Sequence, residues 1–230
     1  MGSDVSLTIT SGKFGRVFGG NKTIGRLHGS ITVNIEENPD CDVPIVIGEL
    51  YGGGNEAPYS IYGYKDEKDE HGKWKPRLKS DYDALSDAQK DAEGIRSAPH
   101  NSPQVNVRSF SSIGNIYGGG YGEDAVMVGS PTVNINEVVL TRADGTPAVN
   151  AYDVKDDQNV PALIDGTNVK LYPHEAGKMG VISTVFGGGN AAKVIGDTHV
   201  NIGTTSEEPF ESLRQADGSV PKKPVAGALA

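Results

Sequence analysis

Residues 182–203 read ISTVFGGGNAAKVIGDTHVNIG, and this stretch decides the fold. It contains three short runs, STVFG, AKVIG and THVNI, which are separated by glycine-containing turns. Alternation of apolar and polar residues with β-branched side chains is typical of strands, and no run keeps the period of an amphipathic helix. Residues 14–35, FGRVFGGNKTIGRLHGSITVNI, repeat the same plan over the same length.

Two motifs of this stretch recur along the chain. The first is an aromatic residue followed by glycines, and its spacings of 33, 66 and 69 residues are close to one period and then two periods twice. The aromatic positions are Phe18, Tyr51, Tyr117 and Phe186, and the glycines expected to be structural include Gly53, Gly119 and Gly188. The second motif resembles TVNI and occurs at residues 30–35, 103–107, 130–135 and 197–202.

Recurrence of a three-strand unit predicts an all-β fold, a parallel β-solenoid of about four to five coils. Each coil would lie on the next at a strand spacing of about 4.8 Å, so that stacking pairs the strand edges. Glycine is expected where the chain turns a corner or where backbone passes close to backbone. Residues 6–10, SLTIT, would be the last strand of a partial coil.

Insertions explain the two long spacings between aromatic positions. We predict a solenoid domain over residues 1–203 with insertions at residues 64–101 and 136–179. The first insertion would leave the solenoid between the second and third strands of a coil. Residues 204–230 are expected to form a C-terminal cap or a linker, because they contain proline and charge but little periodicity.

Each insertion contains local structural signals. The first is highly charged, and we expect a short helix near residues 81–93, with Ser80 as its cap and Gly94 as its end. In the second, the Asp-Gly pairs at 144–145 and 165–166 predict hairpins.

Composition excludes several classes of protein. The formal charge is −9, from 30 acidic and 21 basic residues, so we expect no nucleic-acid partner. No apolar run approaches the length of a transmembrane helix. The single cysteine, Cys41, cannot form an internal disulfide or a thiolate zinc site, and its acidic neighbours do not activate a nucleophilic thiol.

The glycine runs also invite a nucleotide-binding interpretation. Residues 52–57 and 187–192 match the dinucleotide pattern with alanine in third place, but no helix-like run follows, as that pattern requires. No Gly-Lys pair is followed by the Ser or Thr of a P-loop. We therefore expect no cofactor.

Metal and catalytic signals are weak. No histidine pair has the spacing of metal ligands, and the acidic runs at residues 66–70 and 153–157 resemble a calcium loop only in charge. The chain has no Gly-x-Ser-x-Gly elbow. We expect no metal and assign no catalytic residue.

The TVNI motif supplies the candidate ligand-binding residues. If its valine and isoleucine point inward, its threonine and asparagine point outward and stack in two columns. These columns could be a ladder that solvates the sheet or whose amides bond to each other, or a flat strip that binds a glycan or ice. Ice is the weaker case, because Gln104 and His199 interrupt the threonine column. The candidates are Thr32, Asn34, Asn106, Thr132, Asn134 and Asn201, together with Trp74 of the first insertion.

The aromatic motif predicts a further column with one ring per coil. Rings that point inward would fill the core or stiffen the coils, whereas rings that point outward would offer surfaces to sugars. Alternation leaves both orientations open, because the neighbouring residues 17, 50, 116 and 185 are equally apolar.

Residues 185–202, VFGGGNAAKVIGDTHVNI, resemble the Gly-rich solenoid repeats of large surface and adhesin-like proteins from gut bacteria. The resemblance covers four stretches, somewhat under half the chain. The chain departs from the pattern in the missing third glycine of its first copy, in Tyr121 and in its two insertions. The resemblance implies a secreted or surface-displayed, modular protein.

Three functional hypotheses follow. The favoured one is a non-enzymatic domain, extracellular or on the bacterial cell surface, that serves adhesion or binds a glycan or a host-surface protein through its loops and polar face. We expect this location although the first residues carry no signal-peptide pattern. The alternatives are a β-helix polysaccharide lyase or hydrolase, which needs paired carboxylates or a base with cations, and a structural stalk. The oligomeric state stays open.

Overall fold

The computed structural model describes residues 4–38, 41, 43–95, 97–135 and 179–202. The hairpins predicted in the second insertion and the predicted C-terminal cap lie outside these residues. Strands make up 46% of the described part and helices 7%, which confirms the all-β class. None of the described helices is long and apolar enough to cross a membrane.

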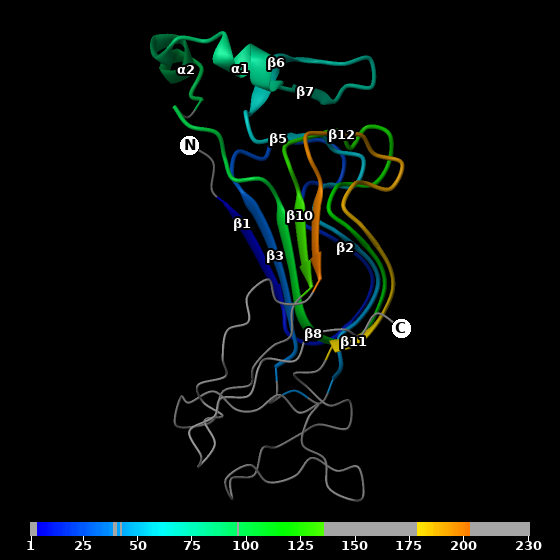
Figure 1. Ribbon diagram of the computed structural model, residues 1–230. Helices are drawn as coiled ribbons and strands as arrows, with labels where there is room; N and C mark the ends of the chain where they lie inside the picture. Colours follow the sequence, from blue (N-terminus) through cyan, green and yellow to red (C-terminus); the bar gives the residue numbers. More distant parts are fainter. Residues whose placement is uncertain (1–3, 39–40, 42, 96, 136–178, 203–230) are drawn as a thin grey trace, which may run out of the picture.

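Strands of successive repeat units pair in parallel and in sequence order (Figure 1). One path runs through β1 (Val5–Ile9), β3 (Ile31–Glu36), β8 (Gln104–Tyr117), β10 (Thr132–Ile135) and β13 (His199–Ile202). A second path runs through β2 (Lys13–Phe18), β4 (Val46–Tyr51), β8 and β11 (Met179–Phe186). A separate three-stranded sheet contains β5 (Tyr59–Ser60), β9 (Met127–Val128) and β12 (Val194–Ile195). The predicted parallel pairing of successive units is confirmed.

The long strand β8 belongs to both paths. Its first half pairs with β3 and β10, where Gln104 lies in register with Thr32 and Thr132. Its second half pairs with β4 and β11. The two strand-like segments at 103–107 and 115–117 are therefore ends of one continuous strand, which the sequence motifs alone did not join.

One apolar core lies between the two paths. Val33 and Ile35 of β3, and Val133 and Ile135 of β10, are completely buried, whereas the threonine and asparagine that alternate with them are half-buried. In the second path, Ile47 and Leu50 of β4 join the same core, as do Ile113 and Ile116 of β8. The alternation in the TVNI motif thus sorts inward from outward side chains as predicted.

Glycines of the aromatic motif allow backbone to approach backbone. A Cβ on Gly53 would lie 2.7 Å from the Met127 Cε and 2.8 Å from the Gly120 nitrogen. A Cβ on Gly119 would lie 2.9 Å from the nitrogen of Gly189. Gly188 occupies the same motif position in the last unit, where an added Cβ meets nothing within 4 Å.

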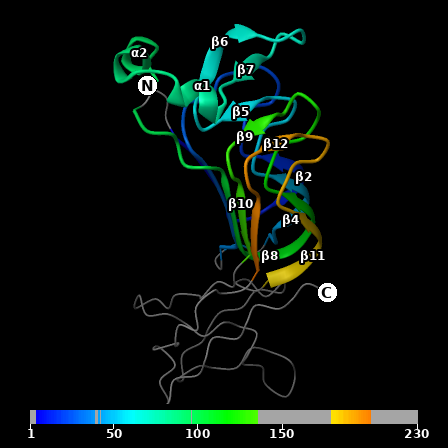
Figure 2. The ribbon, with the colours of Figure 1, turned by 45° about the horizontal axis from the view of Figure 1, so that its top comes forward.

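The first insertion leaves after β5 and returns before β8, as predicted, and it forms a compact lobe beside β5 (Figure 2). The lobe begins with an antiparallel hairpin of β6 (Tyr64–Lys68) and β7 (Trp74–Pro76), which the sequence reading missed.

The expected single helix over residues 81–93 is wrong in detail, because two short helices occur, α1 (Lys79–Asp83) and α2 (Asp87–Ala92). Ser80 lies inside α1 and is not its cap. Ser86 starts the second helix: its hydroxyl accepts a hydrogen bond from the Gln89 amide, and the Gln89 side chain accepts one from the Ser86 amide. Gly94, with φ 66°, follows the end of α2 as predicted.

Substitution of these glycines should destabilise the protein in an inner unit but not in the last unit. We expect Gly53→Ala to lower the free energy of unfolding by about 1–3 kcal/mol, because the new methyl group overlaps backbone of the next unit. Gly188→Ala should change it by less than about 0.5 kcal/mol. Urea unfolding followed by far-UV circular dichroism measures both, and equal losses for the two variants would contradict this packing.

Candidate ligand-binding site

The predicted asparagine column exists. The Asn106 side-chain amide donates to the Asn34 oxygen at 2.9 Å, and Asn134 donates likewise to Asn106 at 2.9 Å. Asn201 donates to Asn134 at 2.8 Å. Each inner side chain therefore uses its oxygen and one N–H within the column, which supports the interpretation as an amide ladder.

The neighbouring column also forms. Thr32 lies in register with Gln104, which pairs with Thr132, and Thr132 pairs with His199. Gln104 and His199 are exposed, while both threonines are half-buried. The structure thus brings together six of the seven candidate ligand residues on one face, and their role in binding stays a prediction.

The aromatic residues stand in a single file. Ring centroids are 4.6 Å apart for Phe18 and Tyr51, 4.8 Å for Tyr51 and Tyr117, and 5.0 Å for Tyr117 and Phe186. Neighbouring planes are within 8° of parallel. The file lies on the face opposite to the core, since the adjacent residues of these strands, such as Leu50, point into the core.

Stacking covers the ring faces that a sugar would need. Tyr51 is fully buried, and burial raises its pKa to about 12. Its hydroxyl donates to Glu49, which also pairs with Arg16 at 2.6 Å. The rings of the file therefore stack on one another, and only the outer faces of Phe18 and Phe186 lack a stacked ring among the described residues.

Trp74, the seventh candidate, lies apart from the columns in β7. The Arg26 guanidinium lies 4.0 Å and the Lys68 ammonium 4.9 Å from the centre of its ring. Both cations form cation–π contacts with the Trp74 ring, so its surface is already in use. Trp74 thereby ties the lobe to the loop that precedes β3.

A cleft of about 1090 Å³ lies between the lobe and the loop that precedes β3. Arg26 and His28 reach it from the loop before β3. Tyr62 and Tyr64 line it from the segment after β5, and Arg77 lines it from the segment after β7. The cleft is thus built by the inserted segment against the repeats, and the sequence motifs did not reveal it.

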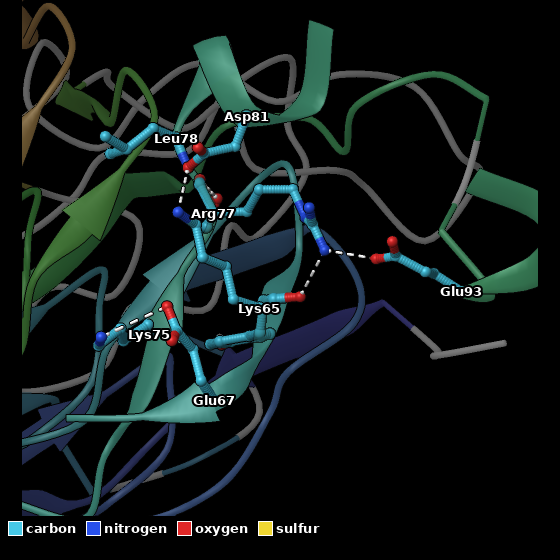
Figure 3. A network of polar contacts seen from close by, with 9 residues as sticks. Lys65, Glu67, Lys75, Arg77, Leu78, Asp81 and Glu93 are labelled. Atoms are coloured by element: carbon cyan, nitrogen blue, oxygen red, sulfur yellow. Dashed lines mark hydrogen bonds and ion pairs between the residues drawn. The ribbon is translucent and has the colours of Figure 1, made fainter. Parts of the chain in front are cut away.

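Arg77 is the best-defined group of the cleft (Figure 3). It is only 6% exposed; its Nη2 donates to Glu93 at 2.7 Å and to the Tyr64 carbonyl oxygen at 3.1 Å. Its Nε is buried and has no hydrogen-bond partner in the described part of the chain. A buried, unpaired donor on a guanidinium costs free energy, so an acceptor that reached the Arg77 Nε would be bound favourably.

Three cations and two carboxylates are among the residues that line the cleft. Arg26, Lys65 and Arg77 line it with permanent charges, against the carboxylates of Asp66 and Glu93. Both carboxylates already have partners, Arg26 at 3.6 Å for Asp66 and Arg77 for Glu93. Lys65 pairs with Asp81 at 3.0 Å (Figure 3). Each of these cations therefore has one carboxylate partner. The longest pair, Arg26 with the exposed Asp66, is the one that an anionic ligand can displace most readily.

Tyrosines provide the apolar wall of the cleft. Tyr64 is buried and held by two hydrogen bonds, from its hydroxyl to the Pro58 oxygen at 3.0 Å and from the Leu27 amide at 3.2 Å. The Tyr62 ring packs on Tyr82 with centroids 5.3 Å apart. Tyr62 is half-buried and offers ring surface in the cleft.

A three-residue cluster of metal-ligand type joins two residues of the lobe with Asp124. Ligand atoms of Asp69, His71 and Asp124 lie within 4.8 Å of one another, which their separation in sequence concealed. His71 contacts Asp124 at 2.8 Å, and this hydrogen bond raises the pKa of His71. The Lys73 ammonium lies 3.5 Å from the same carboxylate. Asp124 therefore already interacts with two side chains, His71 and Lys73.

Comparisons with protein-family models, with curated proteins and with solved structures give no match to this chain.

Removal of an asparagine side chain should lower the free energy of unfolding more inside the ladder than at its end. We expect Asn106→Ala to lower the free energy of unfolding by about 1–2 kcal/mol, because it removes two hydrogen bonds. Asn201→Ala removes one exposed hydrogen bond and should cost about 0.5 kcal/mol or less. Chemical denaturation checks both values, and a neutral Asn106→Ala would contradict a stabilising ladder.

His28 should titrate below its ordinary value. Burial, and next the charge of Arg26, lower the pKa of His28 from 6.5. The unfolded chain then takes up this proton first, so stability is complete above 6.5 and falls as the pH drops from there through the folded-state pKa. NMR titration of the imidazole measures this pKa. Arg26→Gln should raise it and Arg108→Gln should leave it unchanged; a pKa above 6.5 would contradict the assignment.

Proposed function

We propose that this chain is a non-enzymatic β-solenoid domain of an extracellular or cell-surface bacterial protein that binds acidic glycans. The glycan occupies the cleft beneath the first insertion. The observation that carries the proposal is the buried Arg77 in that cleft, with an Nε that lacks a partner among the described residues.

The order of strand pairing supports the solenoid. Each of the three pairing paths visits the repeat units in sequence order and in parallel. The chain passes from β4 to β5 to the first half of β8, and later from β11 to β12 to β13. Such repetition is the plan of a solenoid, in which each unit contacts only its neighbours.

The chemistry of the cleft supports an acidic sugar as the ligand. A guanidinium forms paired, charge-assisted hydrogen bonds with a carboxylate or a sulfate. Arg77 and Arg26 supply such groups, and Tyr62 supplies a ring against which the apolar face of a sugar can pack. The cleft lies on an insertion held by a repeated scaffold, a common arrangement for binding sites.

The enzyme and stalk hypotheses have less support. Hydrolysis needs one carboxylic acid and one carboxylate on either side of a glycosidic bond. Asp66 and Glu93, the carboxylates that line the cleft, are each paired with an arginine. A stalk needs no cleft, whereas the lobe encloses one of about 1090 Å³.

Binding of defined polysaccharides tests the proposal. Isothermal titration calorimetry should detect binding of polygalacturonate, alginate or heparin. It should detect no binding of neutral dextran. Arg26→Gln and Tyr62→Ala should each weaken binding at least about tenfold, equivalent to about 1.4 kcal/mol. Added salt should weaken it further, because the contact is partly electrostatic.

Arg108→Gln is the matched control, since Arg108 forms an exposed pair with Glu36 at 3.2 Å outside the cleft. It should bind like the unaltered chain. Release of reducing ends or unsaturated products would favour the enzyme instead. Absence of binding to every acidic polysaccharide, or equal affinity in all variants, would overturn the proposal.

A further inference from the structure

The last strands of the stack expose side chains that are core elsewhere. Val200 is 40% and Ile202 is 44% exposed, while their register partners on β10, Val133 and Ile135, are 0% exposed. Phe186 ends the aromatic file and is 45% exposed, against 0% for Tyr51. These side chains point as in the inner units, but no described strand covers them.

The same edge lacks the features that normally protect a sheet edge. Neither β11, MGVISTVF, nor β13, HVNI, contains Lys, Arg, Asp, Glu or Pro. Native edge strands are usually blunted by charges or proline, because their unpaired N–H and C=O groups recruit further strands. This edge is therefore built to be covered.

The opposite end of the stack continues the pattern in register. Extension of the internal register places Leu7 opposite Val200, and Ile9 opposite Ile202. It likewise places Phe18 opposite Phe186. β2 contains two cations. Arg16 is held by Glu49, and Lys13 is the first residue of the strand, where the register places it opposite Val181.

We propose that a second copy of this chain covers the edge, its β1 and β2 stacking on β13 and β11 of the first. Strands of two molecules then pack in the same way as strands of two successive repeat units within one chain. The amide ladder has a direction that suits this contact. Each asparagine donates to the one in the preceding unit, and no described residue donates to the Asn201 oxygen, which can therefore accept a hydrogen bond from the next molecule. Thr8, in register with Asn34, supplies a hydroxyl donor for it.

Such a contact is heterologous, so assembly is open-ended and does not stop at a dimer. This inference does not depend on glycan binding, because none of the residues that line the cleft belongs to β1, β2, β11 or β13.

Analytical ultracentrifugation of the full chain tests the inference. The weight-average mass should rise beyond a dimer over an about hundredfold range of concentration. Val200→Lys should weaken association at least about tenfold, since it places a charge in the contact. Leu78→Lys is the matched control, because Leu78 is similarly exposed, 38%, but lies in the lobe; it should assemble normally.

A mixture of two blocked variants gives the sharpest outcome. Phe14→Lys blocks the β2 end, where Phe14 is 39% exposed, and Val200→Lys blocks the β13 end. Each variant should be monomeric alone, and an equimolar mixture should form a dimer and nothing larger. Circular dichroism verifies folding, and Ile202→Lys replaces Val200→Lys if that variant unfolds.

Other outcomes overturn the inference. A chain that stays monomeric over the whole range shows that something other than a second copy covers the edge. A dimer that does not grow shows an isologous contact. Association that Val200→Lys leaves unchanged places the contact elsewhere.

Discussion

The structure depends on backbone pairing between units that are distant in sequence. Strands of one repeat unit pair with those of the next, so β4 finds its partners on β2 and β8 and not on its own neighbours in the chain. Every unit therefore supplies the hydrogen-bond partners of another, as in other repeat proteins. The close approach also fixes where glycine is needed, as at Gly53 and Gly119.

The two faces of the stacked strands have different tasks. Inward side chains such as Val33 and Ile135 form a continuous core, while the outward ones form an asparagine ladder and an aromatic file. In both outward columns the side chains interact mainly with one another. The amides form mutual hydrogen bonds, and the rings stack. The inserted lobe, whose cleft is lined by Arg26 and Arg77, is the part for which we propose ligand binding.

Much of the fold was predictable because repetition turns a local pattern into a long-range contact. Recurring TVNI and aromatic motifs fixed which residues align, and the asparagine column follows directly from them. The direction of the rings was not predictable, since Leu50 and Tyr51 are both apolar. The lobe occurs once, so no repetition could place Arg77 against Tyr64 or join Asp69 with Asp124. The break between α1 and α2 follows from Ser86 with Gln89, a capping pair inside an otherwise helical run.

In-register stacking of successive units is the claim on which the rest depends, and ring-to-ring nuclear Overhauser effects measure it most directly. The account predicts cross-peaks between Phe18 and Tyr51, between Tyr51 and Tyr117 and between Tyr117 and Phe186, whose ring centroids lie 4.6–5.0 Å apart. No cross-peak should join Phe18 to Tyr117. Absence of the neighbouring cross-peaks, or a contact that skips a ring, would contradict the account.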